Sequence, residues 1–334
     1  MDFPVQDGSN TDGHAVTDVN ERKTYRFCFQ GNGGTLFGIQ IVNFLLIIVT
    51  LGVYYFWAKT RVRSYTWSQV DFCGDRFAYH GTGKEVLIGW LKAALFLGIP
   101  FLALKKIPII TGMSEPVIIA GALASSLLVM IFIPVATVGA RRYRLSRTSL
   151  RGIRFSFRGK WQEFAKIFFG CLPWMLLTLG FYRPYFEIRC QDFLIEKGYF
   201  GNKKFSFYGE GKDLLGSYVI AVLLAVPTLL LSFVWYGYKK KKYIWNHISF
   251  ESALFQSTIT FGGIVGLYLV NGLILICTLG FGAPWAKVRT LRYYLEHLTL
   301  EGRVNLMDIV QEARESSAFG EEVGDFFALE FDLG

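Results

Sequence analysis

The stretch TLGVYYFW, residues 50–57, ends the first apolar segment of this 334-residue chain and has two close echoes. TLGFYRPY stands at residues 178–185 and TLGFGAPW at residues 278–285, and each again ends an apolar segment. A phrase that recurs together with its apolar context indicates one structural unit that is used more than once. The architecture that we expect from the sequence is built on this unit.

The similarity around the phrase extends over a whole unit. Residues 25–85 align with residues 153–213 without a gap, and 15 of the 61 pairs are identical. A third, degenerate copy follows, and duplication is the simplest explanation. We therefore predict a disordered N-terminal tail at 1–24, repeat unit 1 at 25–85, two spans and a basic linker at 86–152, repeat unit 2 at 153–213, a span and basic linker at 214–252, repeat unit 3 at 253–306 and an acidic C-terminal tail at 307–334.

The composition is that of a membrane protein. Apolar residues make up 52% of the chain, aromatic residues make up 17%, and the mean hydropathy is +0.34. These values are too apolar for an ordinary soluble domain. Six segments approach the roughly 20 apolar residues that cross a hydrocarbon core of about 30 Å. They are Leu36–Trp57, Val86–Leu104, Pro116–Val138, Phe164–Phe186, Leu214–Tyr236 and Phe261–Trp285.

The sequence between the apolar segments predicts smaller elements. WAKTRVRSYTWSQV, residues 57–70, places bases on one flank and aromatics on the other, which is typical of a helix at the membrane surface. FCGDRFAYHGTG, residues 72–83, and FGNKKFSFYGEG, residues 200–211, read as two short strands around a Gly-Asp or Gly-Asn turn. The expected fold is a mainly α-helical polytopic membrane protein with about six spans, interfacial helices and short β-hairpins.

Two topologies remain open for the repeated units. If all six segments cross once, repeat units 1 and 2 point in opposite directions, as in many transporters. The positive-inside rule opposes this topology, because Arg61 and Arg189 in matching basic loops would then lie on opposite faces. If the segment that ends in TLG instead enters and returns on one face, both loops lie on the same face. Single crossings are our working expectation.

Three groups of residues are candidates for binding. Aromatic and basic residues that follow the TLG phrase are expected to contact lipid headgroups; they are Trp57, Arg61, Tyr185, Arg189, Trp285 and Arg289. Asn43 and Asn271 occupy matching positions inside spans, where hydrogen bonds between helices or a solute path are the alternatives. Lys84 and Lys212 recur in GTGKE and GEGKD loops, which could hold a lipid phosphate or simply cap the next helix.

The sequence contains no recognisable catalytic set. Four histidines, His14, His80, His247 and His297, are scattered, and the five cysteines have no ligand spacing. Neither a nucleophile motif nor a pair of carboxylates within a span is found. We therefore expect no enzyme, no cofactor and no metal.

Several motifs together resemble a known family. The TLG phrase, the G-x-R-F hairpins between spans and the acidic, phenylalanine-rich end FGEEVGDFFALEFDLG, residues 319–334, are similar to the bacterial inner-membrane protein family of unknown function typified by YjgN. The chain departs from that pattern at Phe56, where proline is common, and at Tyr185, where tryptophan is common. The resemblance implies a multi-pass protein of the bacterial inner membrane and supplies no reaction.

Two functional classes follow from these observations. The first is a transporter or channel-like protein for a small solute or lipid, and the alternative is a non-catalytic membrane scaffold or lipid-binding protein. Membrane lipids are the expected partners, and nucleic acid is not expected because the bases lie beside spans. The tail from 307 to 334 has eight acidic residues and one base, so it could dock on the protein's own basic loops. A homo-oligomer is compatible with the sequence.

Overall fold

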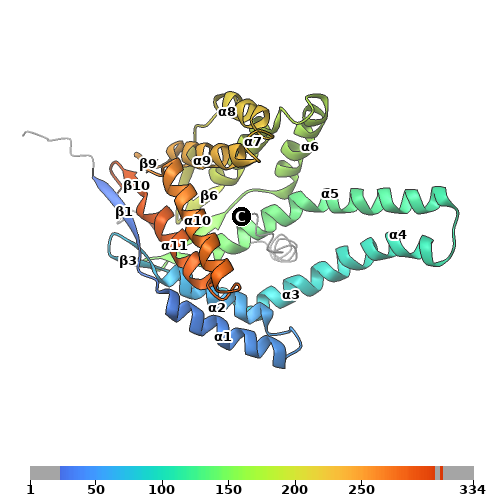
Figure 1. Cartoon of the computed structure of the whole chain (residues 1–334), viewed down its shortest axis with the longest axis horizontal. Coiled ribbons are helices and arrows are strands. Elements are labelled where there is room, and N and C mark those ends of the chain that lie inside the picture. Colours follow the sequence, from blue (N-terminus) through green and yellow to red (C-terminus); the bar gives the residue numbers. More distant parts are fainter. Residues whose placement is uncertain (1–22, 305–308, 311–334) are drawn as a thin grey trace, which may run out of the picture.

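A computed structural model describes residues 23–304 and 309–310 of the chain. Ten short antiparallel strands close into a barrel, and five helical hairpins extend away from it (Figure 1). The order of strand, two helices and strand recurs five times. The strands are β1 (Thr24–Phe29), β2 (Val70–Phe72), β3 (Asp75–Tyr79), β4 (Thr148–Leu150), β5 (Ile153–Phe157), β6 (Gly198–Phe200), β7 (Lys203–Phe207), β8 (Ile248–Phe250), β9 (Ala253–Ser257) and β10 (Leu298–Glu301).

Each helical hairpin leaves the barrel from one strand and rejoins it at the next. In the second hairpin the outgoing helix is long and contains a π-helical segment, η1, and this hairpin projects furthest in Figure 1. The helices are α1 (Gly33–Val49), α2 (Tyr55–Ser68), α3 (Gly83–Ala93), η1 (Ala94–Gly98), α4 (Ile99–Ile110), α5 (Glu115–Ser146), α6 (Trp161–Leu177), α7 (Arg183–Glu196), α8 (Gly211–Leu223), α9 (Leu231–Asn246), α10 (Phe261–Cys277) and α11 (Ala283–Glu296).

The barrel is filled by apolar side chains because its strands alternate. On β1, the side chains of Phe27 and Phe29 pack in the core, while those of Arg26 and Cys28, which alternate with them, are exposed. The same position of each unit supplies one inward phenylalanine, and together these residues are Phe27, Phe77, Phe155, Phe205 and Phe255. Rings on neighbouring strands stack, with centroids 4.5 Å apart for Phe27 and Phe72. A period of two therefore gives the barrel an aromatic interior and a polar exterior.

The two ends of the described chain meet when the barrel closes. Thr24 of β1 is paired with Glu301 of β10, and Phe27 of the same strand is paired with Phe72 of β2. The sheet consequently has no open edge. Tight turns join β2 to β3, β4 to β5, β6 to β7 and β8 to β9, and these turns form the rim of the barrel opposite the helices.

The prediction of a six-span helical protein is wrong. The apolar segment Leu36–Trp57 contains α1, a reversal and the start of α2, and α2 packs back along α1. At the reversal Leu51 and Gly52 have positive φ, 50° and 94°. Thr50 Oγ1 donates to Leu46 O at 2.7 Å and accepts from Tyr54 N at 2.9 Å. Hydropathy registers an apolar run but not a tight turn within it, which is why the sequence indicated a single crossing.

The orientation of the repeated units is corrected as well. Because every hairpin begins and ends at the barrel, residues 25–85 and 153–213 point the same way, and the inverted arrangement is wrong. The stretch expected to lie along the membrane surface is α2, the returning helix of a hairpin. The short predicted hairpins are parts of the single barrel rather than separate elements. The inferred duplication stays a prediction.

Within the described residues, two helical stretches are long and apolar enough to cross a membrane. They are Gly83–Ile110, with 28 residues, and Glu115–Ser146, with 32 residues, and they form the second hairpin. The other outgoing helices have 17, 17, 13 and 17 residues. The two tails predicted at 1–24 and 307–334 lie outside the described residues, except for residues 23–24 and 309–310.

The same reversal occurs a fourth time without its glycine. Thr228 Oγ1 accepts from Ser232 N at 3.1 Å, as Thr50 does from Tyr54 N, but Leu230 with a φ of 68° stands where the other copies have glycine. A left-handed residue other than glycine is strained by roughly 1–2 kcal/mol. We expect Leu230→Gly to raise the free energy of unfolding by about 1 kcal/mol, measured by denaturation in detergent.

The reverse substitution is the matched control for that prediction. Gly180, with a φ of 90°, occupies the equivalent position of the third hairpin. Gly180→Leu should lower the free energy of unfolding by about 1–2 kcal/mol. A lower stability for Leu230→Gly would contradict the equivalence of the two turns.

Candidate functional site

The predicted aromatic contacts pack on glycines of the next unit. A Cβ atom on Gly83 would lie 2.5 Å from Trp57 Cγ, and one on Gly211 would lie 2.6 Å from Tyr185 Cα. Trp285 fills the same role between the last and first units, because a Cβ atom on Gly33 would lie 2.4 Å from its Cδ1. These rings therefore join neighbouring hairpins. The partner basic residues, Arg61, Arg189 and Arg289, are exposed on the returning helices α2, α7 and α11.

The two predicted intramembrane asparagines lie inside hairpins. Asn43 on α1 and Asn271 on α10 are buried, and their Nδ2 atoms lie 3.4 Å from the carbonyl oxygens of Ala58 and Ala286 on the returning helices. Asn271 Nδ2 also donates to Thr290 Oγ1 at 2.9 Å. Each asparagine thus links the two helices of its own hairpin.

The loop around Lys212 carries negative as well as positive charge. Lys212 Nζ lies 2.6 Å from Glu210 Oε2, and Asp213 accepts a hydrogen bond from the Tyr243 hydroxyl. The ammonium group is exposed and already has an acidic neighbour. Gly211 in the same loop is required by the contact with Tyr185. This geometry does not favour an incoming phosphate.

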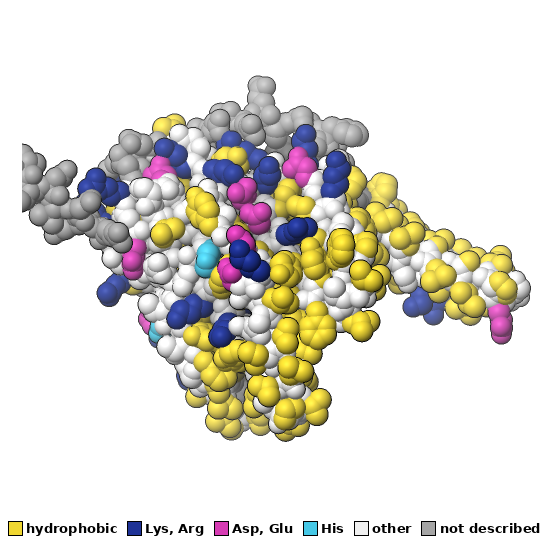
Figure 2. Space-filling view, turned by 90° about the horizontal axis from the view of Figure 1, so that it is seen from above, with side chains coloured by type: hydrophobic (Ala, Val, Ile, Leu, Met, Phe, Trp, Pro, Cys, Tyr) yellow, Lys and Arg dark blue, Asp and Glu magenta, His cyan; other side chains and the backbone are white. Residues whose placement is uncertain are grey.

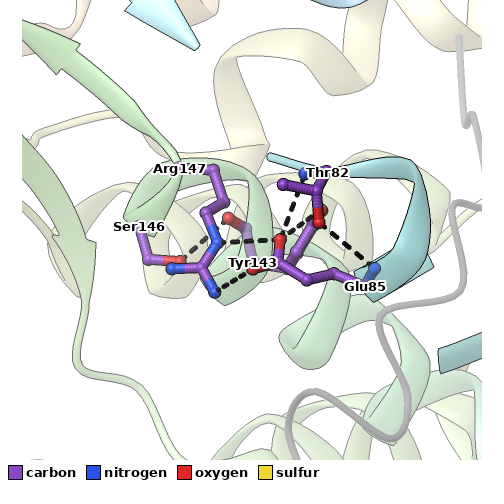
Figure 3. Close-up of polar contacts among 5 residues, drawn as sticks. All are labelled: Thr82, Glu85, Tyr143, Ser146 and Arg147. Atoms are coloured by element: carbon purple, nitrogen blue, oxygen red, sulfur yellow. Dashed lines mark hydrogen bonds and ion pairs between the residues drawn. The ribbon is translucent and has the colours of Figure 1, made fainter. Parts of the chain in front are cut away.

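The matching loop at Lys84 fastens the base of the long hairpin (Figure 3). Lys84 is exposed, whereas Glu85 Oε2 accepts from Thr82 N at 3.2 Å and from the Tyr143 hydroxyl at 3.2 Å. Arg147 donates to both carboxylate oxygens, at 2.9 and 3.1 Å. The two bonds from Arg147 and the one from Tyr143, all accepted by the ionised carboxylate, hold the start of α3 to the end of α5, while the bond from Thr82 caps α3 itself.

A cavity of about 420 Å³ occupies the inside of the barrel. The inward phenylalanine ring surrounds it, and a second ring of Phe72, Leu150, Phe200, Phe250 and Leu300 lies beside the first. On the side of the helices the lining continues with Trp67, Leu145, Ile195, Trp245 and Leu295, near the ends of the five returning helices. We call this space the axial cavity. Its size is that of a small-molecule site, for which about 300–1,000 Å³ is typical.

The axial cavity is covered at the turn rim. Val304 lines it, and Ile309 is only 4% exposed and belongs to the barrel core. A Cβ atom on Gly201, in the turn between β6 and β7, would lie 2.9 Å from Ile309 Cγ2. Val304 and Ile309 therefore lie at the turn rim of the barrel, whereas the arginines described next lie on the side of the helices.

Three arginines line the helical side of the axial cavity: Arg63, Arg141 and Arg144. Arg63 lies over the ring of Tyr79 and donates to its hydroxyl at 3.4 Å, and Arg144 Nε donates to Ala140 O at 3.3 Å. Arg141 Nε is buried and has no hydrogen-bond partner among the described residues. The cavity therefore has a strongly basic end and an aromatic body.

The sequence interpretation missed these arginines as a group. Arg63 and Arg141 lie four residues before the equivalent residues Trp67 and Leu145, but bases near apolar segments were read only as flanking charges. A second cavity of about 860 Å³ lies between the first and last hairpins and shares Arg63 and Trp67 with the axial cavity. Lys59, Asn43 and Lys287 also line it.

Leucines stand at the tips of all four short hairpins. Leu51, Leu179, Leu229 and Leu279 are 94%, 90%, 87% and 89% exposed. Apolar side chains also cover much of the outgoing helices, and in Figure 2 hydrophobic atoms gather on the lower and right-hand parts of the face while charged atoms gather above them. The molecule therefore has an apolar region formed by hairpins and a charged region nearer the barrel.

Comparison with known proteins agrees with a membrane location. The family described as bacterial protein of unknown function (DUF898) matches residues 24–240 and 213–326. The inner membrane protein YjgN of Escherichia coli (strain K12) is 32% identical over 157 residues, which are 47% of this chain and 36% of the relative. YjgN of Salmonella typhimurium is 30% identical over 155 residues, 45% of this chain and 37% of the relative. The matches thus span about a third of the length of these relatives. No solved structure matches the chain.

Proposed function

We propose, from the premise that the chain belongs to the DUF898 family of bacterial proteins of unknown function, that it is a non-catalytic lipid-binding protein of the inner membrane. Its second hairpin crosses the bilayer and returns. The four short hairpins enter from the same side and return without crossing. The observation that carries this proposal is the set of four almost fully exposed leucines at the hairpin tips.

Exposed apolar tips favour lipid over water as their surroundings. Leu51, Leu179, Leu229 and Leu279 are flanked by other exposed apolar residues, among them Val49 at 78% and Val226 at 85%. Contiguous apolar surface of this kind marks a protein or membrane contact. Transfer of apolar surface out of water contributes roughly 25 cal/mol per Å². Arg183, the charged residue next to a short tip, is paired with Glu187 at 2.9 Å.

Helix lengths divide the hairpins into two kinds. A helix of 17 residues, such as α1, is about 25 Å long and falls short of a hydrocarbon core of about 30 Å. The 28 residues from Gly83 to Ile110 give about 42 Å, which is sufficient to cross. Lys105, Lys106 and Glu115, near the tip of that hairpin, are exposed and would reach the far headgroups.

Bases on the outside of the barrel support a cytoplasmic barrel. Exposed side chains of four units at the same outward position are Arg26, Arg76, Arg154 and Lys204. Cytoplasmic segments of inner-membrane proteins carry an excess of lysine and arginine, which also attract anionic lipids. The proposed arrangement therefore places the barrel against the cytoplasmic leaflet.

A transporter or channel is the second candidate. The cavity of about 860 Å³ between the first and last hairpins favours it, because Lys59, Asn43 and Lys287 give this space a polar lining within an apolar region. Water in this cavity would make a cysteine at position 43 reactive toward soluble reagents. The lipid-binding proposal expects position 43 to be shielded.

Single cysteines test the proposed topology. In a chain without its five native cysteines, Leu51→Cys, Leu179→Cys and Leu279→Cys should resist a membrane-impermeant maleimide from both faces. Cys73, kept alone at the turn rim, should react from the cytoplasmic face of inverted vesicles. Gly112→Cys, at the tip of the long hairpin, should react from the outside of spheroplasts. Labelling of the short tips from outside would show that these hairpins cross, and the proposal would fail.

Reaction conditions for Cys73 follow from its surroundings. Burial raises the pKa of its thiol, and the carboxylates of Asp71 and Asp75 raise it further. Because maleimides react with the thiolate, labelling of Cys73 should increase with pH beyond the range in which an ordinary thiol levels off. Labelling is best compared at the same pH for all positions.

A further inference from the structure

We infer that the axial cavity is a binding site for a single-chain amphiphile with an anionic head, either a carboxylate or a phosphate. The head would lie at Arg141, Arg63 and Arg144, and the apolar chain would lie among the phenylalanine rings. The inference deepens the proposed lipid binding and rests on it. The experiment below measures binding in the axial cavity only. The inference can therefore be wrong even if the hairpins insert into the membrane as proposed.

The charge on Arg141 is the first step of the argument. An arginine is protonated at any physiological pH, and burial of one of its N–H groups without a hydrogen-bond acceptor is unfavourable. Arg141 Nε is buried and unpartnered among the described residues, and the neighbouring Arg144 adds positive charge rather than compensating it. An anion that binds at this point would accept the unused hydrogen bond and reduce the repulsion between the two guanidinium groups.

The apolar body of the axial cavity is the second step. Its walls beyond the arginines are mostly phenylalanine, leucine and isoleucine, and Trp67 and Trp245 also line it. A small hydrophilic anion would leave this apolar volume unfilled, and a neutral lipid would leave Arg141 without a partner. An amphiphile with one anionic group satisfies both ends of the site.

The direction of access is the third step. Val304 lines the cavity at the turn rim and the buried Ile309 packs at the turn between β6 and β7, whereas the arginines lie on the side of the helices. The cavity between the first and last hairpins shares Arg63 and Trp67 with the axial cavity, and it lies in the apolar region that the proposed function embeds in lipid. A lipid can therefore approach the arginines laterally from the membrane.

Tryptophan quenching by a brominated ligand tests the inference. The full chain in phosphatidylcholine nanodiscs is titrated with 11-bromoundecanoate, because bromine quenches the fluorescence of tryptophans that it contacts. Trp67 and Trp245 line the axial cavity and are two of the eight tryptophans in the chain. We expect a saturable quenching component that disappears in the variant Trp67→Phe/Trp245→Phe, in which only bilayer quenching of the other six remains.

Head groups and arginine variants make the result specific. 11-Bromo-1-undecanol and 11-bromoundecyl trimethylammonium should need at least ten-fold higher concentrations for half-saturation, and so should the carboxylate with Arg141→Gln. Arg141→Lys keeps the positive charge, so its concentration for half-saturation should lie between those of the unchanged protein and of Arg141→Gln. Arg151→Gln, which changes an exposed arginine at the turn rim, should leave the concentration for half-saturation as in the unchanged protein. Comparison with 11-bromoundecyl phosphate distinguishes a fatty-acid head from a lipid phosphate.

Three outcomes would overturn the inference. The first is equal half-saturation for the carboxylate and the alcohol. The second is unchanged binding to Arg141→Gln, provided that this variant keeps the unfolding temperature of the unchanged protein. The third is binding only to a variant that ends after Val310, which would assign the cavity of the intact chain to its own residues 311–334 rather than to a ligand.

Discussion

Aspartate at the four short hairpin tips is expected to abolish stable insertion of the protein. The variant replaces Leu51, Leu179, Leu229 and Leu279 together, each at least 87% exposed. An aspartate within the hydrocarbon region is unfavourable by about 3 kcal/mol, so four of them oppose insertion by on the order of 10 kcal/mol. The amount of folded protein extracted from membranes in mild detergent, measured by gel filtration, should fall more than ten-fold.

Two residues at the rim of the barrel supply a control, because their backbone also has a positive φ. Cys73 and Arg151 also have positive φ, 57° and 55°, but lie in turns on the opposite end of the molecule. Cys73→Asp and Arg151→Asp should leave the amount of folded protein nearly unchanged. Because aspartate adopts the left-handed region more readily than leucine, strain at the tips is not a competing explanation. An equal decrease in the amount of folded protein for the tip variant and for the rim variants would show that the tips do not contact lipid.

Phe200→Ala is expected to lower the free energy of unfolding by about 3–5 kcal/mol. Phe200 is 4% exposed, and its ring lies 4.6 Å from that of Phe155 and 6.2 Å from that of Phe250. Removal of the ring enlarges the axial cavity, breaks a stacked contact with Phe155 on the neighbouring strand β5 and breaks a tilted contact with Phe250 on β8. The measurement is denaturant unfolding in detergent, followed by the near-ultraviolet signal of the aromatic residues.

A phenylalanine on the outside of a hairpin completes this comparison. Phe44 on α1 is 61% exposed, so Phe44→Ala removes a ring without opening a cavity. Its effect on unfolding in detergent should be below about 1 kcal/mol. Comparable losses for the two variants would mean that the barrel interior is not the stabilising core.

The repeated phrase indicated a recurrent unit but not how many units the chain has. Three copies were recognised because Gly52, Gly180 and Gly280 are retained, whereas Leu230 replaces the glycine in the fourth hairpin. The remaining hairpin has 64 residues between Gly83 and Ser146, so its turn lies further from the preceding strand than the turns of the other hairpins do. The structural equivalence is visible only when the strands are placed side by side.

Barrel closure could not be predicted from local sequence patterns. FCGDRFAY predicts two strands around a turn, as β2 and β3 are, but the partner of β1 on its other side is β10 at the far end of the chain. Pairing over such a distance leaves no periodic signal in the sequence. The candidate site shared this difficulty, because Arg63 and Arg141 come together only when the returning helices converge on one axis.

Aromatic residues after the TLG phrase were assigned to lipid headgroups from their type alone. In the structure, Trp57 and Tyr185 pack against Gly83 and Gly211 of the following hairpins. From the sequence, these glycines belong to loops that could hold a lipid phosphate or simply cap the next helix. Each aromatic ring and the glycine without a side chain therefore form one contact, which becomes apparent only in the folded structure.

The contact between Trp285 and Gly33 has a consequence for biosynthesis. Together with the pairing of Thr24 and Glu301, it makes the last unit a neighbour of the first. While the chain is being translated, β1 has an unpaired edge until β10 has left the ribosome. An open strand edge is prone to aggregation, so early hairpins must wait, already near the membrane, for the carboxyl-terminal unit to close the ring.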